Sequence, residues 1–189
     1  MNQHDDSKTS LGFWIYLMTD CIIFASLFAT YAVLRGSTFG GPSGEDLFSL
    51  PFVLTETIIL LTSSFLCGLA ILAARKGDKK QTLVSLSAAV LLGLAFVGME
   101  LNEFANLVNE GNDWQRSAFL SSFFTLIGTH GLHITIGLIW ASFLGLQIYT
   151  QGLKNSVVKR LFLFSLFWHF LDIVWIFIFT IVYLMGVAL

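Results

Sequence analysis

Charged residues are scarce in this chain of 189 residues. Asp, Glu, Lys and Arg make up 12% of the sequence, whereas 56% of the residues are hydrophobic. A soluble domain carries roughly a quarter charged residues, so this chain lacks the charge needed to cover a surface in water. The formal net charge is −2, and no basic face indicates a nucleic-acid partner. The composition therefore indicates a membrane protein.

Cysteine is almost as scarce. Cys21 and Cys67 lie inside apolar runs without CxxC spacing, which excludes a disulfide framework and argues against a zinc site. The first ten residues, MNQHDDSKTS, also lack the basic start of a secretory signal. The apolar stretch that follows is too long for a signal core, so we expect it to remain in the protein.

The sequence contains five long apolar runs. Each run exceeds the roughly 20 residues that cross a bilayer, and none alternates as barrel strands do, so helices are expected. We predict an all-α fold, a polytopic membrane bundle of five transmembrane helices in one domain (11–189) after a polar tail (1–10). The helices are expected at roughly 11–34, 50–74, 82–103, 118–149 and 159–186.

Lysine and arginine are divided unequally between the two sides of this bundle. One side carries only Arg35 and Arg116, with a glycine-rich loop, GGPSGEDLF. By the positive-inside rule, the N-terminus is cytoplasmic and the C-terminus periplasmic. The other side carries the remaining cations: Lys8, Arg75, Lys76, Lys79, Lys80, Lys154, Lys159 and Arg160.

Three carboxylates fall inside three different predicted helices. An ionisable residue in a membrane span is costly unless it faces protein or a cavity. Asp20 is interpreted as a protonated or hydrogen-bonded core carboxylate. Glu56 and Glu100 lie toward the outer side and could meet there, with Glu103 at the surface; two close carboxylates resist double ionisation. For Glu56, a structural hydrogen bond and a role in proton balance or lipid contact both stay open.

Two polar pairs lie in the last two predicted helices. His130 and His133 are three residues apart and share a helix face, as do His169 and Asp172. Counting residues places His130 and His169 at similar depth, which permits a haem with two axial histidines. The alternative is that these groups fix helix packing by hydrogen bonds. Aromatic crowding around His169 argues against a haem, and the lack of nearby Met or Cys argues against copper.

Glycines in the third and fourth predicted helices suggest close helix packing, since small residues let membrane helices approach one another. The positions are Gly93, Gly98, Gly128, Gly131 and Gly137.

Five segments together resemble subunit III of haem–copper oxidases, in the five-helix form of bacterial cytochrome o ubiquinol oxidases. The resemblance covers nearly the whole chain and rests on the order and spacing of the segments. They are GFWIYLMTDCIIFASLFATYAVL, LPFVLTETIILL, FVGMELNEF, GTHGLHITIGLIW and LFWHFLDIVWIFIFTIVYLMG.

This resemblance implies a non-catalytic subunit of an aerobic respiratory oxidase in the bacterial inner membrane. Haems and copper are expected in subunit I and none in this chain, with subunits I, II and IV and phospholipids as partners. The resemblance makes Glu56 the buried carboxylate linked to proton uptake or lipid. The remaining polar residues form an intramembrane framework: Asp20, Glu100, His130, His133, His169 and Asp172.

Three other functions stay open. The chain could be subunit III of an oxidase that takes electrons from cytochrome c. It could be a b-type cytochrome subunit that uses His130 and His169. It could be a proton-coupled transporter that uses Glu56, Glu100 and Asp20, although it lacks the broken helices and repeats at which transporter sites usually lie.

Overall fold

The computed structural model describes residues 3–38, 40 and 49–188, and within them every long element is a helix. Most of the glycine-rich loop GGPSGEDLF lies outside the described residues. The helices are α1 (Gln3–Leu34), α3 (Leu50–Arg75), α4 (Lys79–Asn109), α5 (Ala118–Gln151) and α6 (Asn155–Ile178), followed by the π-helix η1 (Phe179–Leu184) and the short α7 (Met185–Ala188).

Five of these helical stretches are long and apolar enough to cross a membrane, which confirms the predicted all-α bundle. The helices run beyond the apolar runs. α1 includes polar residues from Gln3 onward, and α4 begins at Lys79 rather than Thr82. The early start of α4 has a local cause, because the Asp78 side chain accepts a hydrogen bond from the Gln81 backbone N–H at 3.0 Å.

The turns after α3 and after α5 are short. Gly77 and Gly152 follow α3 and α5 with φ angles of 79° and 74°, a left-handed conformation that ends a helix and favours glycine. Ser117 then begins α5 by accepting a hydrogen bond from the Leu120 N–H at 3.1 Å. Such tight turns make α3 to α6 successive antiparallel neighbours.

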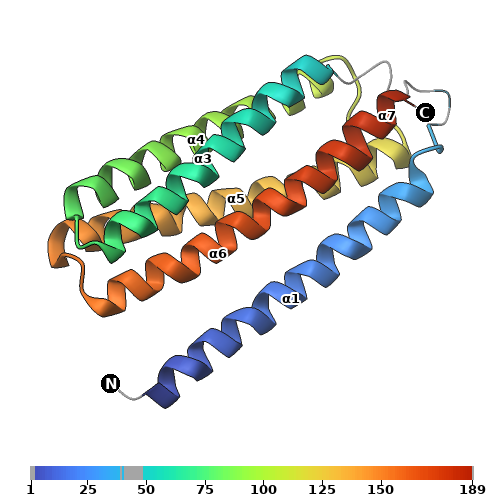
Figure 1. The fold of residues 1–189 in the computed structure, drawn as a ribbon. Coiled ribbons are helices and arrows are strands. Elements are labelled where there is room, and N and C mark those ends of the chain that lie inside the picture. Colours follow the sequence, from blue (N-terminus) through green and yellow to red (C-terminus); the bar gives the residue numbers. More distant parts are fainter. Residues whose placement is uncertain (1–2, 39, 41–48, 189) are drawn as a thin grey trace.

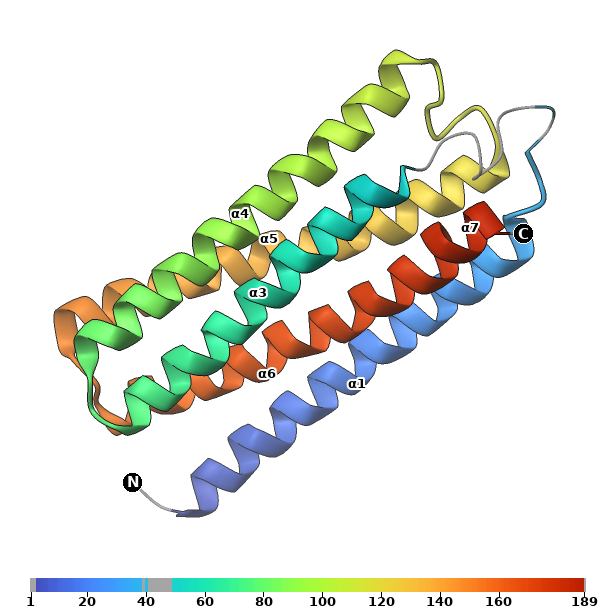
Figure 2. The same ribbon diagram turned by 45° about the horizontal axis from the view of Figure 1, so that its top comes forward.

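The helices form a ring of four with a fifth at its edge (Figures 1 and 2). α3 packs against α4 and α6, and α5 packs against α4 and α6, whereas α1 lies outside the ring against α5 and α6. The two termini lie at opposite ends of the bundle. The turn after α3, the turn after α5 and the start of α1 share one end. The chain therefore gathers eight of its ten Lys and Arg residues at that end.

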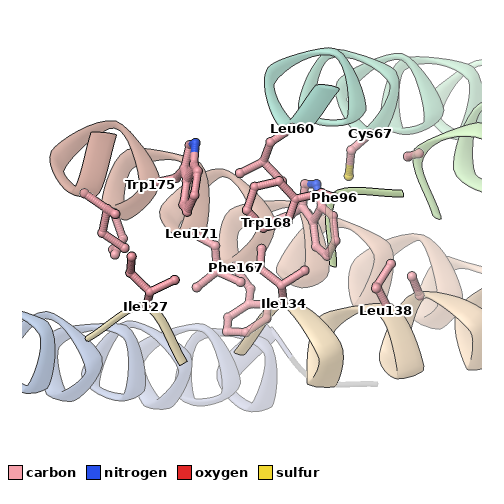
Figure 3. Close-up of a cluster of buried hydrophobic side chains, with 14 of the residues drawn as sticks. Leu60, Cys67, Phe96, Ile127, Ile134, Leu138, Phe167, Trp168, Leu171 and Trp175 are labelled. Atoms are coloured by element: carbon pink, nitrogen blue, oxygen red, sulfur yellow. The ribbon is translucent and has the colours of Figure 1, made fainter. Parts of the chain in front are cut away.

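Trp168 of α6 is the centre of the core, shown in Figure 3 among side chains of α3, α4 and α5. A Cβ on Gly137 would lie 2.9 Å from the Trp168 ring, and a Cβ on Gly93 would lie 2.8 Å from Leu138 and 3.1 Å from Trp168. The Trp168 indole occupies space that a side chain at either position would need. Only glycine therefore fits at Gly93 and Gly137 without a shift of the neighbouring side chains. At Gly98 no close packing occurs within the described chain, because a Cβ there would meet nothing within 4 Å.

Gly137→Ala is expected to destabilise the isolated chain in detergent by about 1–3 kcal/mol, the usual cost of overpacking a core. The rigid indole of Trp168 cannot move aside within the core. Thermal unfolding followed by circular dichroism measures the effect. Gly98→Ala is the control, because its new methyl group meets open space. Equal stability of the two variants would show that Trp168 does not pack on Gly137 as described.

Candidate functional site

The intramembrane polar residues gather at four places. One is an acidic group of Glu56, Glu100 and Glu103 toward the end where α4 finishes. The second is the pair Asp20 and His133 between α1 and α5. His130 lies alone in the core. The fourth place is the contact of Ser64 with His169 and Asp172, between α3 and α6.

Glu56 of α3 is fully buried, and neither of its carboxylate oxygens has a hydrogen-bond partner. Glu100 and Glu103 of α4 are near enough to act on it electrostatically. Glu56 and Glu100 therefore lie near each other, as expected, but they share no hydrogen bond. Buried carboxylates without cations or donors are costly, so Glu56 is poorly compensated in the isolated chain.

Glu103 was expected at the surface, and that expectation is wrong. It is half-buried, and its Oε2 accepts a hydrogen bond from the Tyr183 hydroxyl of η1 at 2.9 Å. α4 continues to Asn109, so Glu103 is still inside the bundle. Its spacing of three residues from Glu100, which puts both on one helix face, was the signal that could have placed it there.

A cavity of about 280 Å³ adjoins this acidic group. Glu103 lines it together with Asn102, Asn106 and Glu110 of α4 and Ser49 before α3. Phe52 and Leu107 add apolar walls, and the cavity lies at the end of the bundle where α4 finishes and α3 begins. The acidic group is therefore next to a polar opening at that end, rather than sealed on all sides by apolar residues.

Glu100 lies against the GTHG segment of α5. A Cβ on Gly131 would lie 2.8 Å from both carboxylate oxygens of Glu100. The sequence predicted that this glycine allows close helix packing, and the structure shows what fills the space. A carboxylate, rather than a neighbouring backbone, occupies the room that Gly131 leaves.

Asp20 and His133 join α1 to α5. The Nε2 of His133 lies 3.7 Å from Oδ1 of Asp20, and Nδ1 lies 2.7 Å from the carbonyl oxygen of Thr129. A carbonyl only accepts, so Nδ1 carries a proton and donates it. Nε2 is then the ring nitrogen that faces the Asp20 carboxyl group, so the contact joins α1 to α5 inside the bundle.

His130 is fully buried in an aromatic cage. Its ring stacks on Trp175 at 5.3 Å between ring centroids and meets the edge of Phe96 at 6.2 Å. Neither ring nitrogen has a hydrogen-bond partner. Trp175 lies six residues beyond His169 on α6, which is about 9 Å along a helix.

The expectation that His130 and His169 share a depth is therefore wrong. His130 is 12 residues from Ala118, the start of α5, whereas His169 is 19 residues from Ala188, the end of α7, so the two side chains lie at different levels. His169 instead contacts Ser64 of α3 through Nδ1, and Nδ1 lies 3.6 Å from Oδ2 of Asp172. The two imidazoles have different neighbours on different helices.

Two tryptophans use hydroxyl groups that the sequence analysis did not single out. The Trp175 Nε1–H donates to Thr57 Oγ1 at 3.0 Å, and the Trp168 Nε1–H donates to Ser63 Oγ at 3.2 Å. Both acceptors lie on α3. Thr57 and Ser64, which both contact α6, are seven residues apart and so lie on one face of α3, two turns from each other. This spacing was the signal in the sequence that could have revealed the polar contacts between α3 and α6.

No described group of three or more His, Cys, Asp or Glu side chains is arranged to hold a metal ion. The polar residues instead form pairs, or lie singly against aromatic rings. This geometry is suited to joining helices and to holding a few protons inside the bundle.

The sequence model for cytochrome c oxidase subunit III matches residues 4–187. This chain belongs to that family. A cytochrome bo(3) ubiquinol oxidase subunit 3 from Pseudomonas aeruginosa is 60% identical over 184 residues, covering 97% of this chain and 88% of the relative. The resemblance drawn from the five sequence segments is confirmed.

Other relatives in the cytochrome c oxidase subunit III family differ in the electron donor of their names. A quinol oxidase subunit 3 from Bacillus subtilis is 47% identical over 178 residues, with 94% of this chain and 87% of the relative covered. A cytochrome c oxidase subunit 3 from Bacillus strain PS3 is 46% identical over 178 residues, covering 94% and 86%. Membership of the family thus does not by itself assign a donor.

Thr57→Val is expected to destabilise the isolated chain by about 1 kcal/mol or more, because the buried Trp175 N–H then lacks an acceptor. Valine has the same shape as threonine, so packing is kept. Thr62→Val is the matched control, because the Thr62 hydroxyl bonds only the Ile58 carbonyl of its own helix. Unfolding by denaturant, followed by tryptophan fluorescence, compares them. Equal loss in both variants would contradict a bond between α3 and α6.

Proposed function

We propose that this chain is a non-catalytic subunit III of a bacterial haem–copper terminal oxidase of the cytochrome o type, which oxidises ubiquinol. The observation that carries the proposal is the 60% identity, over 97% of this chain, to a relative named as a bo(3) ubiquinol oxidase subunit. The relative named for cytochrome c is 46% identical, so the balance favours quinol. An oxidase that takes electrons from cytochrome c is the second candidate.

The internal geometry supports an accessory role. Several polar groups of the bundle make contacts between helices: Trp175 with Thr57, His133 with Asp20, and Glu103 with Tyr183. The reaction of the complex, quinol oxidation coupled to oxygen reduction and proton translocation, is placed in subunit I with its haems and copper. Subunits I, II and IV and phospholipids are the proposed partners, and this chain supports their assembly and sustained proton uptake.

The distribution of cations supports a place and orientation in the bacterial inner membrane. The end of the bundle that carries most Lys and Arg residues faces the cytoplasm by the positive-inside rule. The N-terminus is then cytoplasmic and the C-terminus periplasmic. Glu56, Glu100 and Glu103 lie toward the periplasmic side in this orientation, and the basic turns after α3 and α5 meet cytoplasmic lipid headgroups.

This orientation bears on the roles that the sequence left open for Glu56, which are a structural one and one in proton balance or lipid contact. Protons consumed by the oxidase come from the cytoplasm, whereas Glu56 is six residues into α3 from the opposite end. Its position therefore favours an influence on the stability of the complex, or on lipid at that end, over direct delivery of protons. The polar cavity beside Glu103 supports exchange of protons with the outer side.

The function is tested by a visible spectrum and a pull-down. Tagged chain extracted from membranes is expected to bring down a haem-containing oxidase that oxidises ubiquinol and not reduced cytochrome c. The chain purified alone is expected to show no Soret band. A Soret band in the isolated chain that His130→Phe abolishes would establish a cytochrome and contradict the proposal. Oxidation of reduced cytochrome c would move the chain to the second candidate.

Glu56→Gln is expected to leave the complex assembled and the initial rate of ubiquinol oxidation within about twofold, since glutamine keeps the shape and the position is remote from the cytoplasmic side. The variant should lose activity sooner during prolonged turnover. Oxygen consumption recorded over many turnovers measures both quantities. Asp113→Asn, a change of the same kind at the same end but outside the lining of the cavity beside Glu103, is the control. A large fall in initial rate would indicate direct proton delivery, and loss of assembly a structural role.

A further inference from the structure

His169 differs from every other acidic or histidine side chain inside the five described spans. The others are buried or half-buried, whereas 45% of the His169 side chain is exposed in the isolated chain. Ionisable groups within a membrane normally face protein or a water-filled cavity. The exposed ring of His169 therefore needs a neighbour that this chain does not supply.

The depth of His169 excludes lipid headgroups as that neighbour. It lies near the middle of the span Asn155–Leu184. The centre of a bilayer is about 15 Å from either headgroup region, farther than an imidazole reaches. Hydrocarbon tails offer no hydrogen bond, so lipid alone leaves this ring nitrogen without a partner.

Three exposed threonines along the spans behave differently. Hydroxyl groups of Thr62, Thr125 and Thr180 each donate to a carbonyl of their own helix, at 2.7, 2.7 and 2.8 Å. Such residues can face lipid at little cost because their donors are satisfied. For His169 only Nδ1 is engaged, by Ser64 and near Asp172, and Nε2 has no partner among the described residues.

The geometry points to the face formed by α3 and α6 around His169 as the docking site for a transmembrane helix of another oxidase subunit, which brings a hydrogen-bonding side chain to Nε2. The inference rests on the proposed function, because it needs a complex. The flanks are apolar and exposed, as a helix contact within a membrane requires: Ile173 and Ile176 on α6, with Leu61 and Phe65 on α3.

The partner is identified by its chemistry. It is an apolar helix that carries a Ser, Thr, Asn, Gln or similar side chain near the bilayer centre. Contacts between serine, threonine, amide or histidine side chains join membrane helices in this way. The bond of Nδ1 to Ser64 fixes the ring, so Nε2 is held outward before the partner arrives.

Photo-crosslinking within the whole oxidase tests the docking site. Benzoylphenylalanine at position 173, one turn from His169, is expected to form an adduct with another subunit on illumination. The control is the same group at position 136. Ile136 is also exposed and adjoins Gly137, which touches Trp168, so it lies at the level of His169 on another face. Adducts only with lipid at position 173 would overturn the inference.

The histidine itself is tested by His169→Leu and His169→Gln. Leucine removes the polar contact and suits lipid, whereas glutamine keeps a hydrogen-bonding group. His169→Leu is expected to weaken retention of the chain by the oxidase roughly threefold to thirtyfold, as loss of one hydrogen bond between membrane helices does, and glutamine to restore part of it. Retention equal to wild type in the leucine variant would contradict docking at His169.

Two controls separate this inference from the proposed function. Wild-type chain must first co-purify with a haem-containing oxidase, and failure there rejects the proposed function instead. Unfolding of the isolated His169→Leu chain must match wild type, so that weaker retention reports on docking. A cysteine at position 173 that reacts with a membrane-impermeant maleimide in the intact complex would show a water-filled cavity at this face and overturn the inference.

Discussion

Hydrocarbon offers no hydrogen bonds, and this constraint governs where the polar side chains of the bundle lie. A polar group inside a span must be satisfied by protein. The chain does this in two ways. Exposed threonines bond carbonyls of their own helix, so they stabilise no contact between helices. Buried Trp168 and Trp175 instead donate to hydroxyls of α3, which ties the register of α6 to that of α3.

The same constraint explains why some of the ionisable residues lie beside a polar partner. His133 donates to the Thr129 carbonyl, and its Nε2 lies 3.7 Å from Asp20. Glu103 accepts from Tyr183. Glu56 and His130 remain without hydrogen-bond partners although both are fully buried. Such uncompensated groups make their surroundings sensitive to proton occupancy and to whatever surrounds the chain in its complex.

Apolar run lengths were enough to predict five membrane helices, because the cost of exposing backbone to lipid leaves few alternatives. Close packing at Gly93 and Gly137 was also predictable, since membrane helices approach only where side chains are small. The level of His130 was misjudged although the run boundaries held the signal: His130 is 12 residues into the run 118–149, whereas His169 is 17 residues from the end of the run 159–186. Glu103 was misplaced because α4 continues past its apolar run to Asn109.

The π-helix η1 joins α1 and α4 at the end of the bundle opposite the basic turns. A π-turn inserts an extra residue into a helix and rotates the side chains that follow it. In η1 this rotation accompanies two contacts with other helices. The Val182 carbonyl accepts from the Tyr31 hydroxyl of α1 at 3.5 Å, and Tyr183 reaches Glu103 of α4. A regular continuation of α6 would aim these adjacent residues differently. The altered turn therefore connects α1 and α4, which lie on opposite sides of α6, and it draws the acidic group into the bundle.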